Sequence, residues 1–158
     1  MSDYADCFTA LIDANVLACA MRRNIILSLA EARFFRPRWS DRIMDETAVA
    51  IAKITMGGAD TNKQRSAMER AFLKACVTGY AGLEAGLGLP DPDDRHVLAA
   101  AVTTSAQVIV TENLKDFPSK AFVPFDIDAI LADEFISDAI KLDPLAAVVA
   151  LRKMRERF

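Results

Sequence analysis

Two aspartates stand at the ends of the segments that most clearly predict strands. Asp13 closes a short apolar segment at residues 8–13 (FTALID), and Asp116 follows a β-branched segment at residues 107–111 (QVIVT). Both patterns are typical of buried strands. Because sites in parallel α/β sheets form beyond the carboxyl ends of the strands, we expect both carboxylates to lie at one edge of the sheet.

Two further acids are expected to approach that edge from helices. Asp94 lies in the first turn of a helical pattern at residues 93–105, which leads into the second strand. Glu46 faces the same way as Ile43 and Ala50 on a helix for which Ser40 is the predicted N-cap. An inward-facing carboxylate is costly unless a cation meets it.

A cluster of Asp13, Glu46, Asp94 and Asp116 would suffer strong mutual repulsion. Such a cluster is tolerable when it holds Mg²⁺ or Mn²⁺, which are hard cations that prefer oxygen ligands. A divalent ion can lower the pKa of a bound water and neutralise charge on a phosphate that is being cleaved. The pattern therefore indicates a metal site suited to phosphate-ester chemistry.

Each of these acids also has an ordinary structural interpretation. Asp13 could cap the helix that follows it, and Glu46 could pair with Arg42 one helical turn earlier. Asp116 precedes a Phe-Pro pair and could be a turn residue. Capping and the helix dipole account for two of the three aspartates at the start of the 93–105 helix, which are Asp91, Asp93 and Asp94.

The order of segments predicts one α/β domain. Strands that alternate with helices indicate a mostly parallel sheet covered on both faces. An additional edge strand is expected at residues 122–125, where Pro124 would be tolerated. The predicted helices cover residues 15–20, 24–35, 40–53, 62–77, 93–105, 129–140 and 144–157.

Composition limits the class of protein. The chain has 158 residues, of which 53% are hydrophobic, so it predicts a single globular domain. The net charge of −3 at pH 7 counts mildly against nucleic-acid binding, although carboxylates gathered for a metal contribute to it.

Cysteines and the start of the chain indicate a reducing compartment. Cys7, Cys19 and Cys76 have no CxxC spacing, and Cys19 and Cys76 are expected in apolar helices as free thiols. We see no signal-peptide pattern and no segment long and uncharged enough to span a bilayer. We therefore expect a cytoplasmic protein without membrane contact.

Basic side chains near the predicted site could hold a phosphate group of the substrate. Arg95 and Lys115 stand beside proposed metal ligands. Arg38 and Arg42 belong to an arginine cluster interleaved with aromatics such as Trp39, a combination that suits single-stranded RNA. Burial of the aromatics in the core is the favoured interpretation of that second group.

Four blocks of sequence resemble a known family. In order and spacing they resemble the PIN-domain family, most closely the branch with the VapC-type toxins of bacterial toxin–antitoxin pairs. The resemblance implies a PIN-like three-layer α/β/α sandwich with a central, mostly parallel sheet of four or five strands. It places this domain at residues 1–125 and a packed C-terminal helical extension at 126–158. The blocks are LIDANVL at 11–17, RPRWSDRIMDE at 36–46, PDPDDRHVLAAAV at 90–102 and VIVTENLKDFP at 108–118.

The resemblance also implies a set of site residues. Asp13, Glu46 and Asp94 match acids of the family, whereas many relatives carry an acid at the position of Asn113. Either Asp116 supplies the fourth carboxylate or Asn113 contributes through its carbonyl oxygen or a water. Supporting positions next to the acids are Asn15 and Thr111.

The activity that the resemblance implies is that of a Mg²⁺- or Mn²⁺-dependent endoribonuclease. It would hydrolyse RNA, with tRNA or rRNA loops as possible targets, by in-line attack of an activated water. No histidine is required, and His96 is expected to be a partly exposed helix residue. The implied partners are an antitoxin protein and a second copy of the chain. The apolar faces of the early helices would offer contacts through Val16, Leu17, Ile25, Ile26 and Leu29.

Two other functions compete with this interpretation. A haloacid-dehalogenase-type phosphatase also has an aspartate at the end of its first strand, but it needs a second acid where this chain has Asn15. A PIN-like RNA-binding module with weakened catalysis is the other alternative, which Asn113 keeps open. The presence of Asp13, Glu46 and Asp94 argues against the loss of catalysis.

Overall fold

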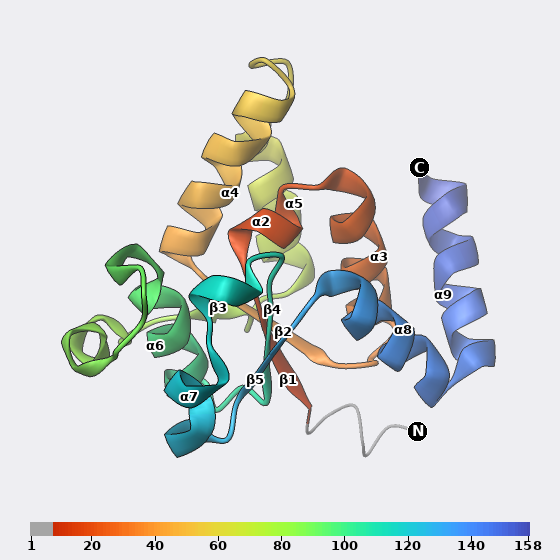
Figure 1. Ribbon diagram of the computed structural model, residues 1–158. Coiled ribbons are helices and arrows are strands. Elements are labelled where there is room, and N and C mark those ends of the chain that lie inside the picture. The colour runs from red at the N-terminus through yellow and green to blue at the C-terminus, as the bar shows by residue number, and fades with distance from the viewer. Residues whose placement is uncertain (1–7) are drawn as a thin grey trace.

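A five-stranded, fully parallel sheet forms the centre of the computed structural model, which describes residues 8–158 (Figure 1). The strand order β3-β2-β1-β4-β5 places the first strand in the middle. The chain adds β2 and β3 on one side of β1, and then β4 and β5 on the other side. The strands are β1 (Thr9–Ile12), β2 (Arg36–Ser40), β3 (Cys76–Val77), β4 (Val108–Val110) and β5 (Asp128–Ile130). This architecture confirms the predicted α/β class and parallel sheet.

The two central strands are fully buried and carry the register of the sheet. Every residue of β1 and β4 is buried, as expected for strands covered on both faces. Leu11 pairs with Ile109, and the Asp13 N–H donates to the Val110 carbonyl at 2.9 Å. Asp13 and Thr111 therefore leave neighbouring strands side by side.

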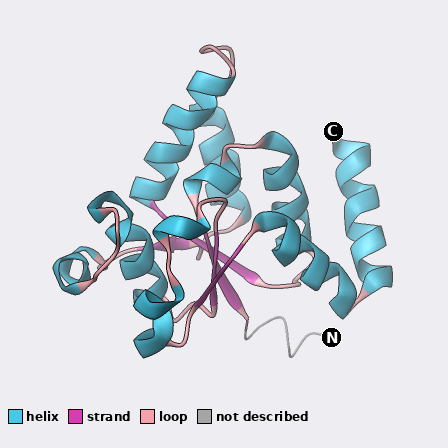
Figure 2. Cartoon of the chain, viewed as in Figure 1, coloured by secondary structure: helices cyan, strands magenta, loops and turns pink. Residues whose placement is uncertain are grey.

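Helices cover both faces of this sheet (Figures 1 and 2). Figure 1 shows α6 and α7 on one side, and α3 with α8 and α9 on the other. The α-helices are α2 (Ala14–Leu17), α3 (Ala20–Glu31), α4 (Asp41–Ile54), α5 (Thr61–Ala71), α6 (Arg95–Thr103), α7 (Ser119–Phe122), α8 (Ala132–Leu142) and α9 (Pro144–Arg157). Short 3₁₀ turns occur at η1 (Ala81–Gly86), η2 (Pro92–Asp94), η3 (Leu114–Asp116) and η4 (Val123–Phe125). Within residues 8–158 we find no helix of the length and apolarity needed to cross a bilayer.

Strand β2 was missed because of its proline. Pro37 pairs in register with Ala10 of β1, whereas β3 pairs only with Trp39 and Ser40. At Pro37 the β3 side of β2 therefore needs no backbone donor, which is where a sheet tolerates proline.

The prediction of a helix through residue 77 is wrong. Helix α5 ends at Ala71, and the backbone of Phe72 is no longer helical. The ring of Phe72 packs edge-on against Trp39 at 6.0 Å, and Ala75 accepts a hydrogen bond from the Trp39 N–H. These contacts turn the chain into β3, where Cys76 is exposed rather than in an apolar helix.

The predicted edge strand at residues 122–125 is also wrong. Phe122 ends α7 and is buried in a stack on Phe117, which holds this segment in a helical turn. The edge strand is β5, at residues that were predicted to begin a helix at 129. Because β5 pairs with β4, the segment 126–158 contributes a strand to the sheet as well as helices.

Aromatic and aliphatic side chains fill the core, as the favoured interpretation of the aromatic residues predicted. Trp39, Phe34 and Phe35 are buried, which confirms that these aromatics are core residues. The proposal that the early helices offer free apolar faces to partners is wrong for the fully buried side chains, which are Val16, Leu17, Ile26 and Leu29. Cys19 is half-buried and free, and Cys7 lies outside the described residues.

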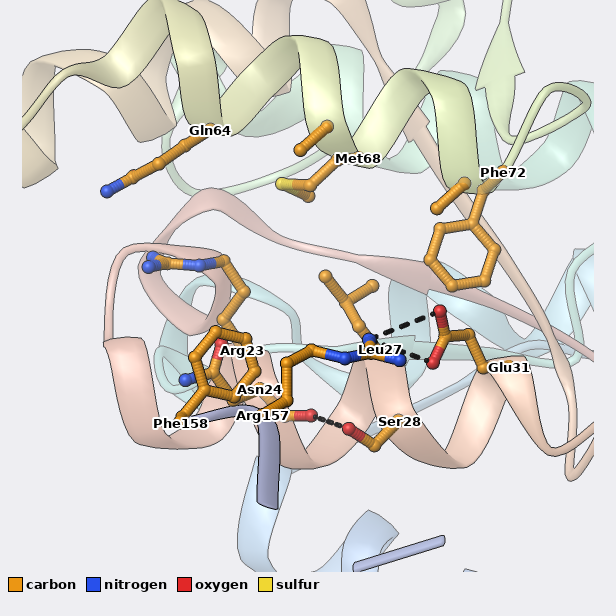
Figure 3. A pocket seen from close by; sticks show the side chains of 12 residues that line it. Arg23, Asn24, Leu27, Ser28, Glu31, Gln64, Met68, Phe72, Arg157 and Phe158 are labelled. Atoms are coloured by element: carbon orange, nitrogen blue, oxygen red, sulfur yellow. Dashed lines mark hydrogen bonds and ion pairs between the residues drawn. The ribbon is translucent and has the colours of Figure 1, made fainter. Parts of the chain in front are cut away.

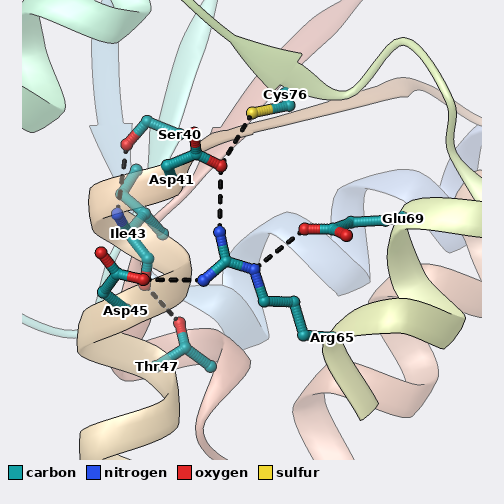
Figure 4. Close-up of polar contacts among 8 residues, drawn as sticks. All are labelled: Ser40, Asp41, Ile43, Asp45, Thr47, Arg65, Glu69 and Cys76. Carbon is teal, nitrogen blue, oxygen red and sulfur yellow. Dashed lines mark hydrogen bonds and ion pairs between the residues drawn. The ribbon is translucent and has the colours of Figure 1, made fainter. Parts of the chain in front are cut away.

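One arginine ties α4 to α5 (Figure 4). Arg65 of α5 donates to Asp45 at 2.7 Å and to Asp41 at 3.0 Å, both on α4. It also donates to Glu69 at 2.9 Å within its own helix, and Cys76 Sγ lies 3.5 Å from Asp41. The network fixes α5 against α4, the helix that carries Glu46.

The start of α4 provides a test of the local folding signals. Ser40 Oγ accepts a hydrogen bond from the Ile43 N–H at 3.1 Å and is fully buried. Ser40→Ala should lower the free energy of unfolding by about 1 kcal/mol, because the cap is lost. Urea unfolding measures this change, and the exposed Ser66→Ala serves as control. Equal stability of both variants would contradict the capping role.

Candidate functional site

The first acid of the site is held rigidly at the carboxyl end of β1. Asp13 is buried and caps α2, with Oδ1 accepting from the Ala14 N–H at 2.7 Å. Its Oδ2 accepts from the Thr111 hydroxyl at 2.9 Å. Burial raises the pKa of Asp13, and these two hydrogen bonds partly oppose that rise. The capping interpretation is therefore correct, and it fixes the carboxylate as well.

Thr111 connects two segments of the site. Its hydroxyl donates to Asp13 and lies within hydrogen-bond distance of the Asn15 amide, at 3.3 Å, and of the Asn113 N–H, at 3.2 Å. The Asn15 carbonyl oxygen accepts from the Glu112 N–H at 3.1 Å. The loop after β4 is thus tied to the start of α2, which explains how these polar residues support Asp13.

Three aspartates gather beside this network. One carboxylate oxygen from each of Asp91, Asp94 and Asp116 lies within 4.8 Å of the others. Asp91 also caps η2 by accepting from the Asp93 N–H at 2.9 Å. The Asn113 amide donates to Asp116, which orients that carboxylate.

Burial and the repulsion between the acids raise two pKa values at the site. Burial first, and then the charges of Asp13, Asp91 and Asp116, raise the pKa of Asp94 to about 6. Burial, Asp13 and Asp94 similarly raise the pKa of Glu46 to about 7, against a lowering effect of Arg42. The five carboxylates therefore share one field, although they come from four segments of the chain.

Glu46 reaches the site from α4, and one of its carboxylate oxygens lies close to two other side chains. Its Oε1 lies 3.8 Å from Arg42 Nε, as the helix-pair interpretation predicted, and 2.9 Å from His96 Nε2. The prediction for His96 is wrong, because the imidazole is fully buried rather than partly exposed. Burial and the charge of Arg42 lower the pKa of His96 to about 4, so the ring is neutral near pH 7.

The donor set fits a hard divalent cation. All of the gathered groups are carboxylate or amide oxygens, which Mg²⁺ and Mn²⁺ prefer as ligands. Burial, and then the charges of neighbouring carboxylates, raise the pKa values of Glu46 and Asp94, and a bound cation would offset that repulsion. Asp13, Asp94, Asp116 and Glu46 would hold such an ion, with Asp91 as an additional ligand.

The basic candidates differ in how close they lie to these acids. Arg42 contacts Glu46 and lies 3.6 Å from Glu84, and Arg95 begins α6 directly after Asp94. Lys115 is exposed in η3 beside Asp116. Arg38, in contrast, donates to Thr104 at 3.2 Å, at the end of α6 opposite to Asp94. Of these four residues, Arg42 has a side-chain contact with one of the acids, whereas Arg95 and Lys115 are neighbours of the acids in sequence.

A hollow elsewhere on the molecule has a different character. A cavity of about 370 Å³ lies between α3, α5 and the end of α9, and Figure 3 shows its lining. Leu27, Met68 and Phe72 line it, and its acid, Glu31, is paired with Arg157 at 3.3 Å. None of the gathered carboxylates lines this cavity, so the chemistry belongs to the carboxyl edge of the sheet.

Two residues of the site were not predicted from the sequence. Asp91 was assigned a capping role, which it has, but the turn η2 also brings its carboxylate to Asp94 and Asp116. His96 was expected to be a partly exposed helix residue, although every residue of α6 from His96 to Ala101 is buried. The charge density of the DPDD sequence and the apolar run after His96 were the available signals.

Comparison with known proteins agrees with this architecture. The family model of the PIN domain matches residues 9–115, so the chain belongs to the PIN domain family.

A relative whose name includes an activity matches a shorter stretch of the chain. Over 49 residues the chain is 55% identical to a protein of Mycobacterium tuberculosis (strain ATCC 25618 / H37Rv) named "Putative ribonuclease VapC50". This stretch covers 31% of the chain and 29% of that protein, so the chain matches less than a third of the relative's length. No solved structure matches the chain.

The raised pKa values predict how stability depends on pH. A carboxyl whose pKa is higher in the folded chain binds its proton more tightly there, so stability falls as pH rises between the two values. For Glu46 that window extends from 4.5 to about 7, and for Asp94 from 3.8 to about 6. His96 acts in the opposite direction between about 4 and 6.5.

Glu46→Gln removes one of these contributions. In EDTA, the wild-type chain should lose more unfolding free energy than Glu46→Gln between about pH 5 and about pH 8, because its Glu46 becomes charged beside other acids. Urea unfolding at each pH measures the difference, and the exposed Glu156→Gln is the control. A steeper loss in Glu46→Gln than in the wild type would contradict the shared field.

Proposed function

We propose that this chain is a Mg²⁺- or Mn²⁺-dependent endoribonuclease, the toxin of a toxin–antitoxin pair. The observation that carries the proposal is the convergence of Asp13, Asp94, Asp116 and Glu46, with Asp91, at the carboxyl edge of a PIN-domain sheet. The 49-residue likeness to a protein with a ribonuclease name supports RNA as the substrate.

Each acid would have a distinct part in holding the reacting groups. Asp13 has both oxygens engaged by fixed donors, so its position is set before any ligand arrives. Asp94 and Asp116 lie at the more open side of the cluster, where both are half-buried. A divalent ion would supply Lewis-acid polarisation of the phosphate and a bound water of lowered pKa.

Basic residues at the rim would hold the RNA backbone. Lys115 and Arg95 flank the aspartates in sequence, and Arg42 borders Glu46. Positive side chains beside a carboxylate cluster would offset the repulsion between those acids and a phosphate. Arg38 is the weakest of the earlier candidates, because Thr104 and the Pro37 carbonyl already accept its hydrogen bonds.

The competing phosphatase has less support. The family match assigns the fold to the PIN domain rather than to a dehalogenase-type fold. At the position where that phosphatase needs an acid, Asn15 instead bridges Thr111 and Glu112. An RNA-binding module without catalysis remains the alternative that the cleavage experiment distinguishes.

Cleavage of total RNA by the purified chain tests the activity. Mg²⁺ or Mn²⁺ should produce discrete fragments, which EDTA abolishes. Asp94→Asn should slow cleavage by about 100-fold or more, because several kcal/mol of charge stabilisation depend on the ion it would hold. Asp93→Asn removes the same charge one residue away from the cluster and should retain most of the rate. RNA that is bound but left intact with either metal would favour the binding module.

The partners of this toxin would be an antitoxin and a second copy of the chain. Exposed apolar side chains gather where α8 meets α9, at Leu142, Leu145, Val148 and Val149. The end of α9 is basic and α8 carries exposed acids such as Asp133 and Asp138. Two copies could place these opposite charges against each other around an apolar centre.

Sedimentation tests this contact between copies. The wild-type chain should sediment as a dimer, and Leu145→Glu should shift it toward a monomer, because a charge would be buried at the interface. Val123→Glu, at an exposed apolar residue of η4, is the matched control. A monomeric wild-type chain at micromolar concentration would contradict the dimer.

A further inference from the structure

The buried histidine has no role in the site described so far. His96 is the single histidine of the chain, and no part of it is exposed. A neutral imidazole carries one N–H donor and one acceptor nitrogen. Burial of either group without a partner is costly. The position must therefore be explained by what the ring does for a neighbour.

Glu46 is the neighbour in reach of the ring. Nε2 of His96 lies 2.9 Å from Glu46 Oε1, although neither ring nitrogen has a hydrogen bond of regular geometry within residues 8–158. A rotation of the carboxylate that brings Oε1 onto the line of the Nε2–H bond would complete this hydrogen bond. The contact joins α6, which begins directly after Asp94, to α4, which carries Glu46.

The two partners of this contact differ in freedom. The imidazole is fixed in the core, because Val97 and Leu98 beside it are also fully or nearly fully buried. The Glu46 side chain is 43% exposed and is long and flexible. Arg42 competes for the same Oε1 only at 3.8 Å and is shared with Glu84. The ring is therefore the fixed point and the glutamate is the group that it can orient.

We propose that His96 is a positioning residue, which holds Glu46 Oε1 by its Nε2–H and leaves Oε2 for a divalent ion at the acid cluster. The shortest contacts of Glu46 with Arg42 and with His96 both involve Oε1, not Oε2. Groups that orient a metal ligand in this way typically change metal affinity by about 10–100-fold when they are removed. The inference rests on the proposed function only in that Glu46 helps to hold the ion.

The single histidine makes the contact directly observable. Long-range ¹H–¹⁵N NMR of the side chain reports the tautomer of one imidazole without overlap from others. In EDTA the spectrum should show the proton on Nε2, and Glu46→Gln should shift these signals. Mg²⁺ should shift them in the wild type and leave them unchanged in Glu46→Gln. A proton on Nδ1, or signals that ignore both Glu46→Gln and Mg²⁺, would overturn the proposal.

Two substitutions separate positioning from packing. His96→Leu fills the space without a donor, and His96→Gln keeps an N–H donor near the position of Nε2. Mn²⁺ affinity, measured by electron paramagnetic resonance, should fall by about 10–100-fold in His96→Leu and recover largely in His96→Gln. Equal affinity in all three proteins, or an equal loss in both variants, would overturn the proposal. If His96→Leu does not fold, the NMR comparison decides alone.

The outcomes also distinguish this inference from the proposed function. A wild-type chain that binds Mn²⁺ with His96 coupled to Glu46, but cleaves no RNA, would contradict the ribonuclease and leave the positioning role in place. Cleavage that is lost in Asp94→Asn, together with His96 signals that do not change in Glu46→Gln, would support the ribonuclease and contradict the positioning role. A wild-type chain that binds no Mn²⁺ would contradict both.

Discussion

Repulsion between carboxylates is the constraint around which this end of the molecule is arranged. Asp13, Asp94, Asp116 and Glu46 come from segments far apart in sequence. Burial, together with the charges of Asp13 and Asp94, raises the pKa of Glu46 to about 7. Such an arrangement lowers stability near neutral pH unless a cation offsets it. The sheet tolerates it because the buried β1–β4 pair, with Leu11 opposite Ile109, supplies the apolar contacts that hold its ends together.

The fixed and adjustable parts of the site are separated by element. Asp13 is clamped by a backbone N–H and by Thr111, so the sheet itself sets its position. Glu46, on α4, meets the cluster through a flexible side chain whose helix is anchored by the Arg65 network on its other face. A site built in this way can bind a ligand between a fixed carboxylate, Asp13, and a flexible one, Glu46.

The predictable part of the structure was the part governed by local pattern. The apolar run ending in Asp13, the β-branched run before Thr111 and the cap at Ser40 all formed as expected, since each depends on neighbours in sequence. The strand with Pro37 and the two-residue strand at Cys76 were missed, because pairing partners rather than propensity decide them. Burial of His96 depends likewise on tertiary packing, because α6 is covered all round from His96 to Ala101.

The placement of β5 determines where the chain can be truncated. The family-matched region, residues 9–115, ends after β4, whereas β5 and α8 follow it. β5 covers the outer hydrogen-bonding side of β4, and the Thr111 N–H donates to Ile130 at 3.0 Å. A fragment cut at residue 115 would therefore expose an apolar strand edge next to the acids, the kind of edge that recruits another chain and starts aggregation.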